Sequence, residues 1–321
     1  NNGGDVLRGD GIRDYVFTEI MFSGRVRFSG NSANPNMGVI NVRFDDIHMD
    51  GRRTTGDCHL FLQGKVWPDS NNIQFHMNQD VRDVAVINSD LLFSKGDAPI
   101  NSDDNLNINS GSGNYWIFNN NLLGTNHREA IDIGGGDSLI VEYNFIHGGQ
   151  NGYAVIKLHA QYFAMNHPVI RFNLIGGGSD DIMLAGYGWK HGDIYNNILL
   201  KNTPAPTGRV AFYIGEHSPD AHQRIFITEP DSSIYANNII MGMTIFLRAD
   251  MPEYVYDLYW DLGDGDFRDP NRDYARLDTN VIIWRRTWDD RNLWYRNQFR
   301  NNIFYRHGTT ANLIRLSLIH I

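Results

Sequence analysis

One short phrase returns along the whole chain: a side-chain amide or carboxylate, then two large apolar residues, then a turn. A fixed phrase at a spacing of tens of residues indicates one structural unit stacked on itself. This repeat constrains the fold more than any other feature, because each unit buries its apolar residues only against its neighbours. The phrase begins at Asp46, Asp90, Asn121, Asn144, Asn173, Asn197, Asn238 and Asn302.

The segments between these positions have the pattern of short β-strands. Apolar and polar residues alternate over residues 39–44 and 138–143, as in half-buried strands. Glycine clusters at 134–136 and 176–178 separate the strand segments, and helical periodicity is absent. The long gap between Asp46 and Asp90 is expected to hold two units, with a strand at 73–77. The chain is therefore expected to be all-β.

Short strands, Asn and Gly corners and units of about 25 residues resemble a single-stranded right-handed parallel β-helix. The resemblance covers residues 15–308 and implies one solenoid domain over 1–315, with loop insertions. Asn side chains at successive corners are expected to hydrogen-bond each other, so the repeated Asn is assigned a structural role. Residues 316–321 resemble a translated sequencing adapter, and we expect them to be a non-native tail.

Composition excludes several kinds of partner. The net charge of −9 disfavours nucleic acid, whose phosphates bind basic surfaces. No apolar run approaches the roughly 20 residues of a membrane-spanning helix. Cys58 is the single cysteine, so no intrachain disulfide forms, and a buried apolar role is expected for it.

The most specific candidate site lies on segments that follow successive corners, at 130–134, 155–159, 182–186, 211–215 and 245–248. If these segments stack in one sheet with their Ile and Leu side chains inside, Asp132, Lys157 and His159 project outward, and Tyr213 follows on the same face. Asp132 and Lys157 would then lie about 5 Å apart. Lysine with a lowered pKa serves as a general base. The alternative is a row of surface ion pairs without function.

A second candidate cluster follows residue 178. Asp180 and Asp181 are adjacent carboxylates that could ligate Ca²⁺ or act as an acid–base pair. Aromatic rings nearby offer flat faces on which sugars stack. The residues predicted to bind substrate are Tyr187, Trp189, Lys190, His191 and His217. The alternative is a polar corner beside a core tryptophan.

A β-helix with this outer face resembles the secreted pectate lyases and the alginate lyase and chondroitinase B group. The resemblance implies that Lys157 removes the proton next to a uronate carboxylate and that His159 or Tyr213 protonates the leaving oxygen. It also implies that Arg248 neutralises the uronate.

Further expectations follow from the same resemblance. Asp132, Asp180 and Asp181 would ligate Ca²⁺. The expected protein is an extracellular, secreted monomer that degrades a polysaccharide and binds neither nucleic acid nor membranes.

Two other readings stay open. A glycoside hydrolase on the same fold is suggested by Asp180–Asp181 followed by His191–Gly192, which is similar to polygalacturonases. A tailspike or adhesin would bind glycans without cleaving them. Fold alone does not choose among the three, because function resides in the site.

Overall fold

The chain is described by a computed structural model. The described residues are 5–30, 37–54, 57–64, 66–69, 72–75, 80–94, 104–109, 111–124, 129–148, 154–159, 165–177, 182–187, 189–201, 210–215, 233–243, 245–250, 274–277, 281–285, 298–306 and 316–320. In these residues the regular structure is β-strand, apart from one 3₁₀ turn, η1 (Gly51–Arg53). None of them forms a helix with the length and apolar character needed to cross a bilayer.

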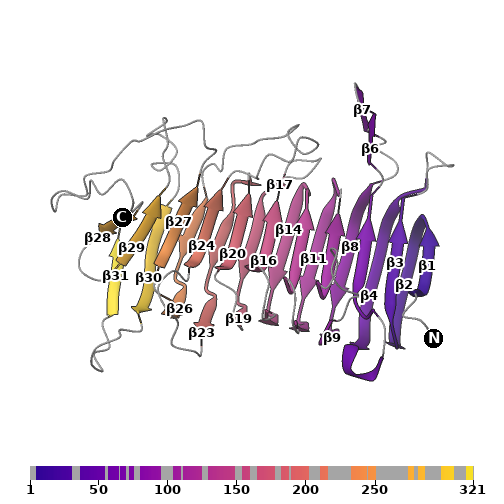
Figure 1. Cartoon of the computed structure of the whole chain (residues 1–321), viewed down its shortest axis with the longest axis horizontal. Helices are drawn as coiled ribbons and strands as arrows, with labels where there is room; N and C mark the ends of the chain where they lie inside the picture. Colours follow the sequence, from indigo (N-terminus) through magenta and orange to yellow (C-terminus); the bar gives the residue numbers. More distant parts are fainter. Residues whose placement is uncertain are drawn as a thin grey trace.

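The first large sheet takes one strand from each repeat. Among the described residues it has eleven strands, parallel except for β28, and they stack side by side along the long axis (Figure 1). In spatial order they are β1 (Asp5–Asp10), β3 (Arg25–Ser29), β5 (Leu60–Gln63), β10 (Leu106–Asn109), β13 (Ile131–Gly134), β16 (Ala154–His159), β20 (Ile182–Tyr187), β24 (Val210–Gly215), β27 (Ile245–Asp250), β29 (Val281–Arg285) and β28 (Tyr274–Leu277).

The second sheet, with sixteen strands in the described part, forms two rows joined at both ends. One row is β2 (Ile12–Phe22), β4 (Val39–Asp50), β8 (Val81–Ile87), β11 (Asn114–Phe118), β14 (Ser138–Glu142), β18 (Pro168–Arg171), β22 (Asp193–Tyr195), β25 (Ile234–Ala236) and β30 (Gln298–Arg306). The other is β9 (Asp90–Leu92), β12 (Asn121–Leu123), β15 (Phe145–His147), β19 (Leu174–Gly177), β23 (Ile198–Lys201) and β26 (Ile239–Met243). β4 pairs with β8 and β9, and β30 pairs with β25 and β26. β31 (Leu316–His320) adds antiparallel to β30.

The chain alternates between the two sheets, and parallel neighbours come from successive repeats. This confirms the all-β prediction and is compatible with a solenoid of the parallel β-helix kind. Apolar side chains from both sheets form one continuous core that runs from Val26 to Met243. Each repeat therefore buries its apolar residues against the next, as the repeated phrase predicts.

The expected extra unit between Asp46 and Asp90 is wrong. β7 (Asn72–Phe75) pairs antiparallel with β6 (Val66–Asp69) in a separate hairpin that projects from the stack (Figure 1). β8 pairs directly with β4, and neither strand of this hairpin enters either large sheet. The apolar pattern of residues 73–77 predicts a solenoid strand, but β7 pairs with β6, its neighbour in sequence. A second two-stranded sheet joins β17 (Met165–Asn166) to β21 (Trp189–Lys190).

Buried asparagines at one corner form the predicted ladder. The side-chain Nδ2 of each donates to Oδ1 of the next at 2.9–3.0 Å. Each Oδ1 also accepts from the preceding ladder residue's backbone N–H. Buried backbone polar groups need such partners, and the ladder supplies an acceptor for the turn N–H of each asparagine from Asn120 to Asn238. The Asn ladder consists of Asn120, Asn144, Asn173, Asn197, Asn238 and Asn302.

The predicted ladder position was wrong in the early repeats. Asn120 occupies the ladder, whereas Asn121 is exposed and donates to Asp90. In the preceding repeat Ser89 takes this place: its N–H donates to Asn120 and its Oγ accepts from the N–H of Ile47. The buried apolar residue stands two positions after the ladder residue. An Asn that directly precedes the first apolar residue is therefore not always the ladder residue.

Cys58 is buried, as expected, with 2% of its surface exposed. Burial, and after it the charge of Asp50, raises the pKa of the Cys58 thiol to about 11. At pH 8 we expect a thiol reagent to label the folded protein at least about 100-fold more slowly than the unfolded chain. Labelling with an aromatic disulfide, before and after addition of guanidinium, measures this ratio. Rapid labelling of the folded protein would contradict the buried position.

Candidate active site

The outer face of the eleven-stranded sheet carries the residues predicted from sequence. Asp132 on β13 is in register with Lys157 on β16, and then come Ala185 on β20 and Tyr213 on β24. The apolar residues next to them in sequence, such as Ile131, Ile156 and Phe212, face the core. Side chains alternate along a strand, so this register column projects from the opposite face. The predicted stacking of the five segments is confirmed.

Asp132 contacts both basic partners. Lys157 Nζ donates to Asp132 Oδ2 at 3.1 Å, and His159 Nε2 lies 2.8 Å from Oδ1. Asp132 and His159 are buried, while the Lys157 side chain keeps 21% of its surface exposed. Asp132 therefore orients an amine and an imidazole from the next strand, and the amine still reaches solvent.

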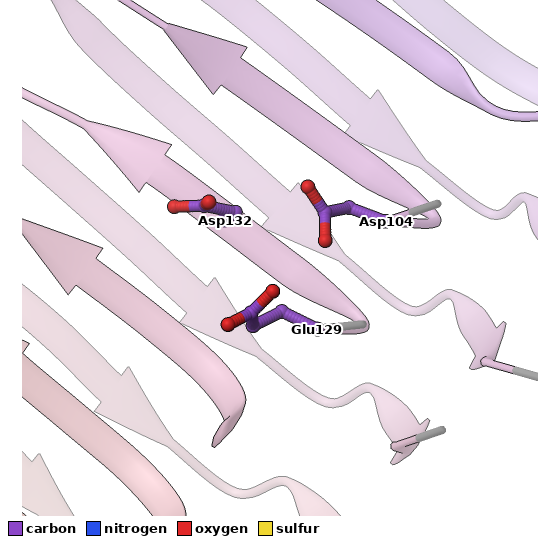
Figure 2. A group of neighbouring side chains, drawn as sticks. All are labelled: Asp104, Glu129 and Asp132. Carbon is purple, nitrogen blue, oxygen red and sulfur yellow. The ribbon is translucent and has the colours of Figure 1, made fainter. Parts of the chain in front are cut away.

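Two further carboxyl groups join Asp132. Asp104 and Glu129 lie just before the adjacent strands β10 and β13, and Figure 2 shows them with Asp132 on the same side of the sheet. One oxygen from each of the three lies within 4.8 Å of the others, and all three residues are buried. Asn107, in register with Asp132, donates from Nδ2 to Asp104 Oδ2 at 2.7 Å. We call Asp104, Asn107, Glu129 and Asp132 the oxygen cluster.

Sequence reasoning missed Asp104, Asn107 and Glu129. The sequence does contain a signal for them: residues 106–108 repeat the apolar–polar–apolar pattern of residues 131–133, with which they pair in the sheet, so that Asn107 lies opposite Asp132. The same alignment matches Asp104 with Glu129. The alternating Asn residues of 105–109 resemble a polar loop more than a central strand, which hid the repeat.

The pKa values of two carboxyl groups in the oxygen cluster, Asp104 and Asp132, are shifted in opposite directions. Burial, and then the negative charges of Asp132 and Glu129, raises the pKa of Asp104 well above its ordinary value. Burial also acts to raise the pKa of Asp132, but His159 and Lys157 outweigh it and hold that pKa below its ordinary value. Without a bound cation, Asp104 thus tends to keep a proton while Asp132 stays ionised.

Lys157 responds to the same charges. Burial lowers its pKa, but Asp132 and Glu129 outweigh burial, and the pKa of the Lys157 ammonium is raised. Lys157 therefore stays protonated at neutral pH while these carboxylates are uncompensated. A base role requires that their charge be offset.

The oxygen cluster fits a hard divalent cation. Ca²⁺ prefers carboxylate and amide oxygens, which are the groups present here. Asn107 Oδ1 is a buried acceptor that has no hydrogen-bond donor among the described residues. Even with Lys157 and a charged His159 beside them, three ionised carboxyl groups would keep an excess of negative charge, and a proton or a cation relieves such an excess. Asp104, Glu129, Asp132 and Asn107 are thus the residues that would hold Ca²⁺.

Several predicted residues lie elsewhere. Trp189 is fully buried and donates from Nε1 to Ser233 Oγ at 3.1 Å, so the prediction that it stacks on substrate is wrong. His191 is exposed and stacks on His167 at a centroid distance of 5.1 Å. It directly follows β21, which belongs to the small sheet with β17. Tyr213 shares the register column but is itself buried.

The remaining predicted residues are placed in part or not at all. Tyr187, Lys190 and Arg248 lie in β20, β21 and β27, with Arg248 in register with Tyr213, but their side chains are outside the described part. Asp180, Asp181 and His217 fall outside the described residues altogether. Comparison of the chain with protein-family models, with curated proteins and with solved structures gave no match.

Proposed function

We propose that the chain is a single right-handed parallel β-helix and a secreted lyase that cleaves a uronate-containing polysaccharide by β-elimination. The observation that carries the proposal is the contact between Lys157 and the oxygen cluster on one outer face. Elimination next to a carboxylate needs a base for the proton and a positive charge for the carboxylate. Lys157 would supply the base, and the oxygen cluster on the neighbouring strands would hold the cation that supplies the positive charge.

The chain's own residues divide the chemistry as follows. Lys157 Nζ, as the neutral amine, takes the proton from the carbon next to the uronate carboxylate. The electron pair of that bond forms the new C=C bond, and the glycosidic C–O bond breaks. His159 gives a proton to the leaving oxygen, and Asp132, in contact with both, holds their positions. Ca²⁺ in the oxygen cluster would supply the positive charge that neutralises the uronate.

A glycoside hydrolase is the second candidate, because the carboxyl oxygens approach within 4.8 Å of one another. This is near the separation of about 5 Å that retaining glycosidases use. Asp104 would be the acid and Asp132 the nucleophile. The raised pKa of Asp104 and the lowered pKa of Asp132 support this division of roles.

A substrate panel with two readouts tests the proposal. We expect pectate, alginate or a glycosaminoglycan to yield a product with the far-ultraviolet absorbance of an unsaturated sugar. EDTA should abolish this signal and Ca²⁺ should restore it, whereas Mg²⁺ should restore little, because it binds poorly to a cluster made only of protein oxygens.

The other outcomes identify the rival functions. New reducing ends without the absorbance, insensitive to EDTA, would establish the hydrolase in place of the lyase. Binding of a polymer without any product would identify a glycan-binding protein. Asp104→Asn tests the Ca²⁺ site, because it keeps the shape of the side chain and removes its negative charge. Its affinity for Ca²⁺, measured by calorimetry, should be at least about tenfold weaker than that of the parent chain.

A further inference from the structure

A second group of basic side chains lies on the same outer face as the candidate active site. Arg27 on β3 is in register with Phe61 on β5, which is in register with Asn107 on β10. The column continues to Asp132 and Lys157. Arg27 thus stands four strand spacings from Lys157, about 19 Å along the stack.

Arg27 is unusual among the basic residues near it. Arg25 pairs with Asp5 and, at 2.5 Å, with Asp57. No carboxylate in the described part of the chain lies within ion-pair distance of Arg27, and its buried Nε has no hydrogen-bond partner there. Its guanidinium instead lies over the Phe61 ring, 5.2 Å from the centroid.

A third arginine completes the group. Arg8 on β1 is in register with Arg27, and its side chain is 64% exposed, with only a long 3.9 Å contact to Asp5. Burial, and then the charge of Arg25, lowers the pKa of Arg27, and the carboxylates of Asp5 and Asp10 offset this effect only in part. A half-buried cation on an aromatic ring, beside a second exposed cation, has the features of a receptor for an anion.

We propose that Arg27, Phe61 and Arg8 form a distal subsite for an acidic sugar of the polysaccharide substrate. The carboxylate of the sugar would bind the two guanidinium groups, while the Phe61 ring contacts the edge of the sugar. This rests on the polysaccharide substrate proposed above and adds the direction of binding. The polymer lies along the register column, across successive repeats, and spans several sugar units between Arg27 and Lys157.

Length dependence follows from this geometry. A short acidic oligosaccharide that fills the site near Lys157 does not reach Arg27, whereas a long one does. Loss of Arg27 should therefore raise KM about tenfold for a long substrate, with little change in kcat. The KM for a dimer or trimer should stay unchanged.

The test separates binding from turnover. Affinity electrophoresis measures how strongly gels that contain alginate, polygalacturonate, heparin or neutral dextran retard the protein. The retardation is compared for the parent chain, Arg27→Met and Arg8→Ala. Arg27→Met keeps the packing on Phe61 and removes the charge. Arg13→Ala, on an exposed position of β2 in the other sheet, is the control. We expect retardation by the acidic gels to fall about tenfold in Arg27→Met, less in Arg8→Ala and not in Arg13→Ala.

Each outcome has a defined meaning. The distal subsite is overturned if dextran retains the protein as strongly as the acidic gels do. It is also overturned if Arg27→Met has a normal melting temperature and is retained as strongly as the parent chain. A response to heparin alone replaces the carboxylate with a sulfate and overturns the uronate form of the proposal. Arg27-dependent retention without any product refutes the lyase but leaves the distal subsite standing, so the two failures are distinguishable.

Discussion

Replacing Lys157 with Met is expected to lower turnover of the uronate polymer by about 10³-fold, within the range of a general base. Lys157 is the amine that contacts Asp132, beside the oxygen cluster. Met keeps the length of the side chain and removes the proton acceptor. Initial rates from the ultraviolet absorbance of the product, with Ca²⁺ present, measure the loss.

The control for Lys157 is an equivalent ion pair on the other sheet. Arg171 on β18 pairs with Glu142 at 2.7 Å and is likewise partly exposed. Arg171→Met should keep full turnover, since it breaks a cross-strand pair in the other large sheet and leaves the register column intact. A small primary amine added to Lys157→Met should restore part of the rate, which a purely structural role would not do. Full turnover by Lys157→Met would remove Lys157 from the mechanism.

The all-β stack of parallel strands could be predicted from the sequence because its signal is repeated. The ladder slots at Asn144, Asn173 and Asn197 could be read directly, since each is followed by an outward and then an inward apolar residue. The slot was missed at Asn120, where three consecutive asparagines leave the register ambiguous. There Asn119 adopts the left-handed conformation of the turn, with φ of 54°, and Asn120, the next residue, therefore occupies the ladder position.

The candidate site could be predicted only where polar residues interrupt a clear apolar alternation. Asp132, Lys157 and His159 were found because Ile and Leu flank them on strands of the core. Asp104 and Glu129 precede their strands, where no alternation operates, and their meeting depends on strand register. Charge balance is also invisible in sequence: Lys157 suggests a base, and the neighbouring carboxylates that raise its pKa appear only in three dimensions.

Replacing Asn173 with Ala is expected to lower the free energy of unfolding by about 4 kcal/mol. Its Nδ2 donates to Val141 O at 2.8 Å and to Asn197 Oδ1 at 3.0 Å, and its Oδ1 accepts from Asn144. All of these groups are buried, so alanine leaves several without partners. Urea unfolding followed by tryptophan fluorescence measures the change in the midpoint.

Two matched variants separate the ladder from asparagine chemistry in general. Asn121→Ala removes an exposed side chain whose hydrogen bond, within the described residues, goes to Asp90, and it should cost less than about 1 kcal/mol. Asn173→Ser should fall between the two, because Ser89 already fills the ladder slot in an earlier repeat through one hydroxyl. The bonds from one ladder residue to the next join adjacent repeats, so the loss in Asn173→Ala should weaken the coupling between its own repeat and its neighbours. Equal midpoints for Asn173→Ala and Asn121→Ala would mean that strand pairing and core burial hold the stack together without the ladder.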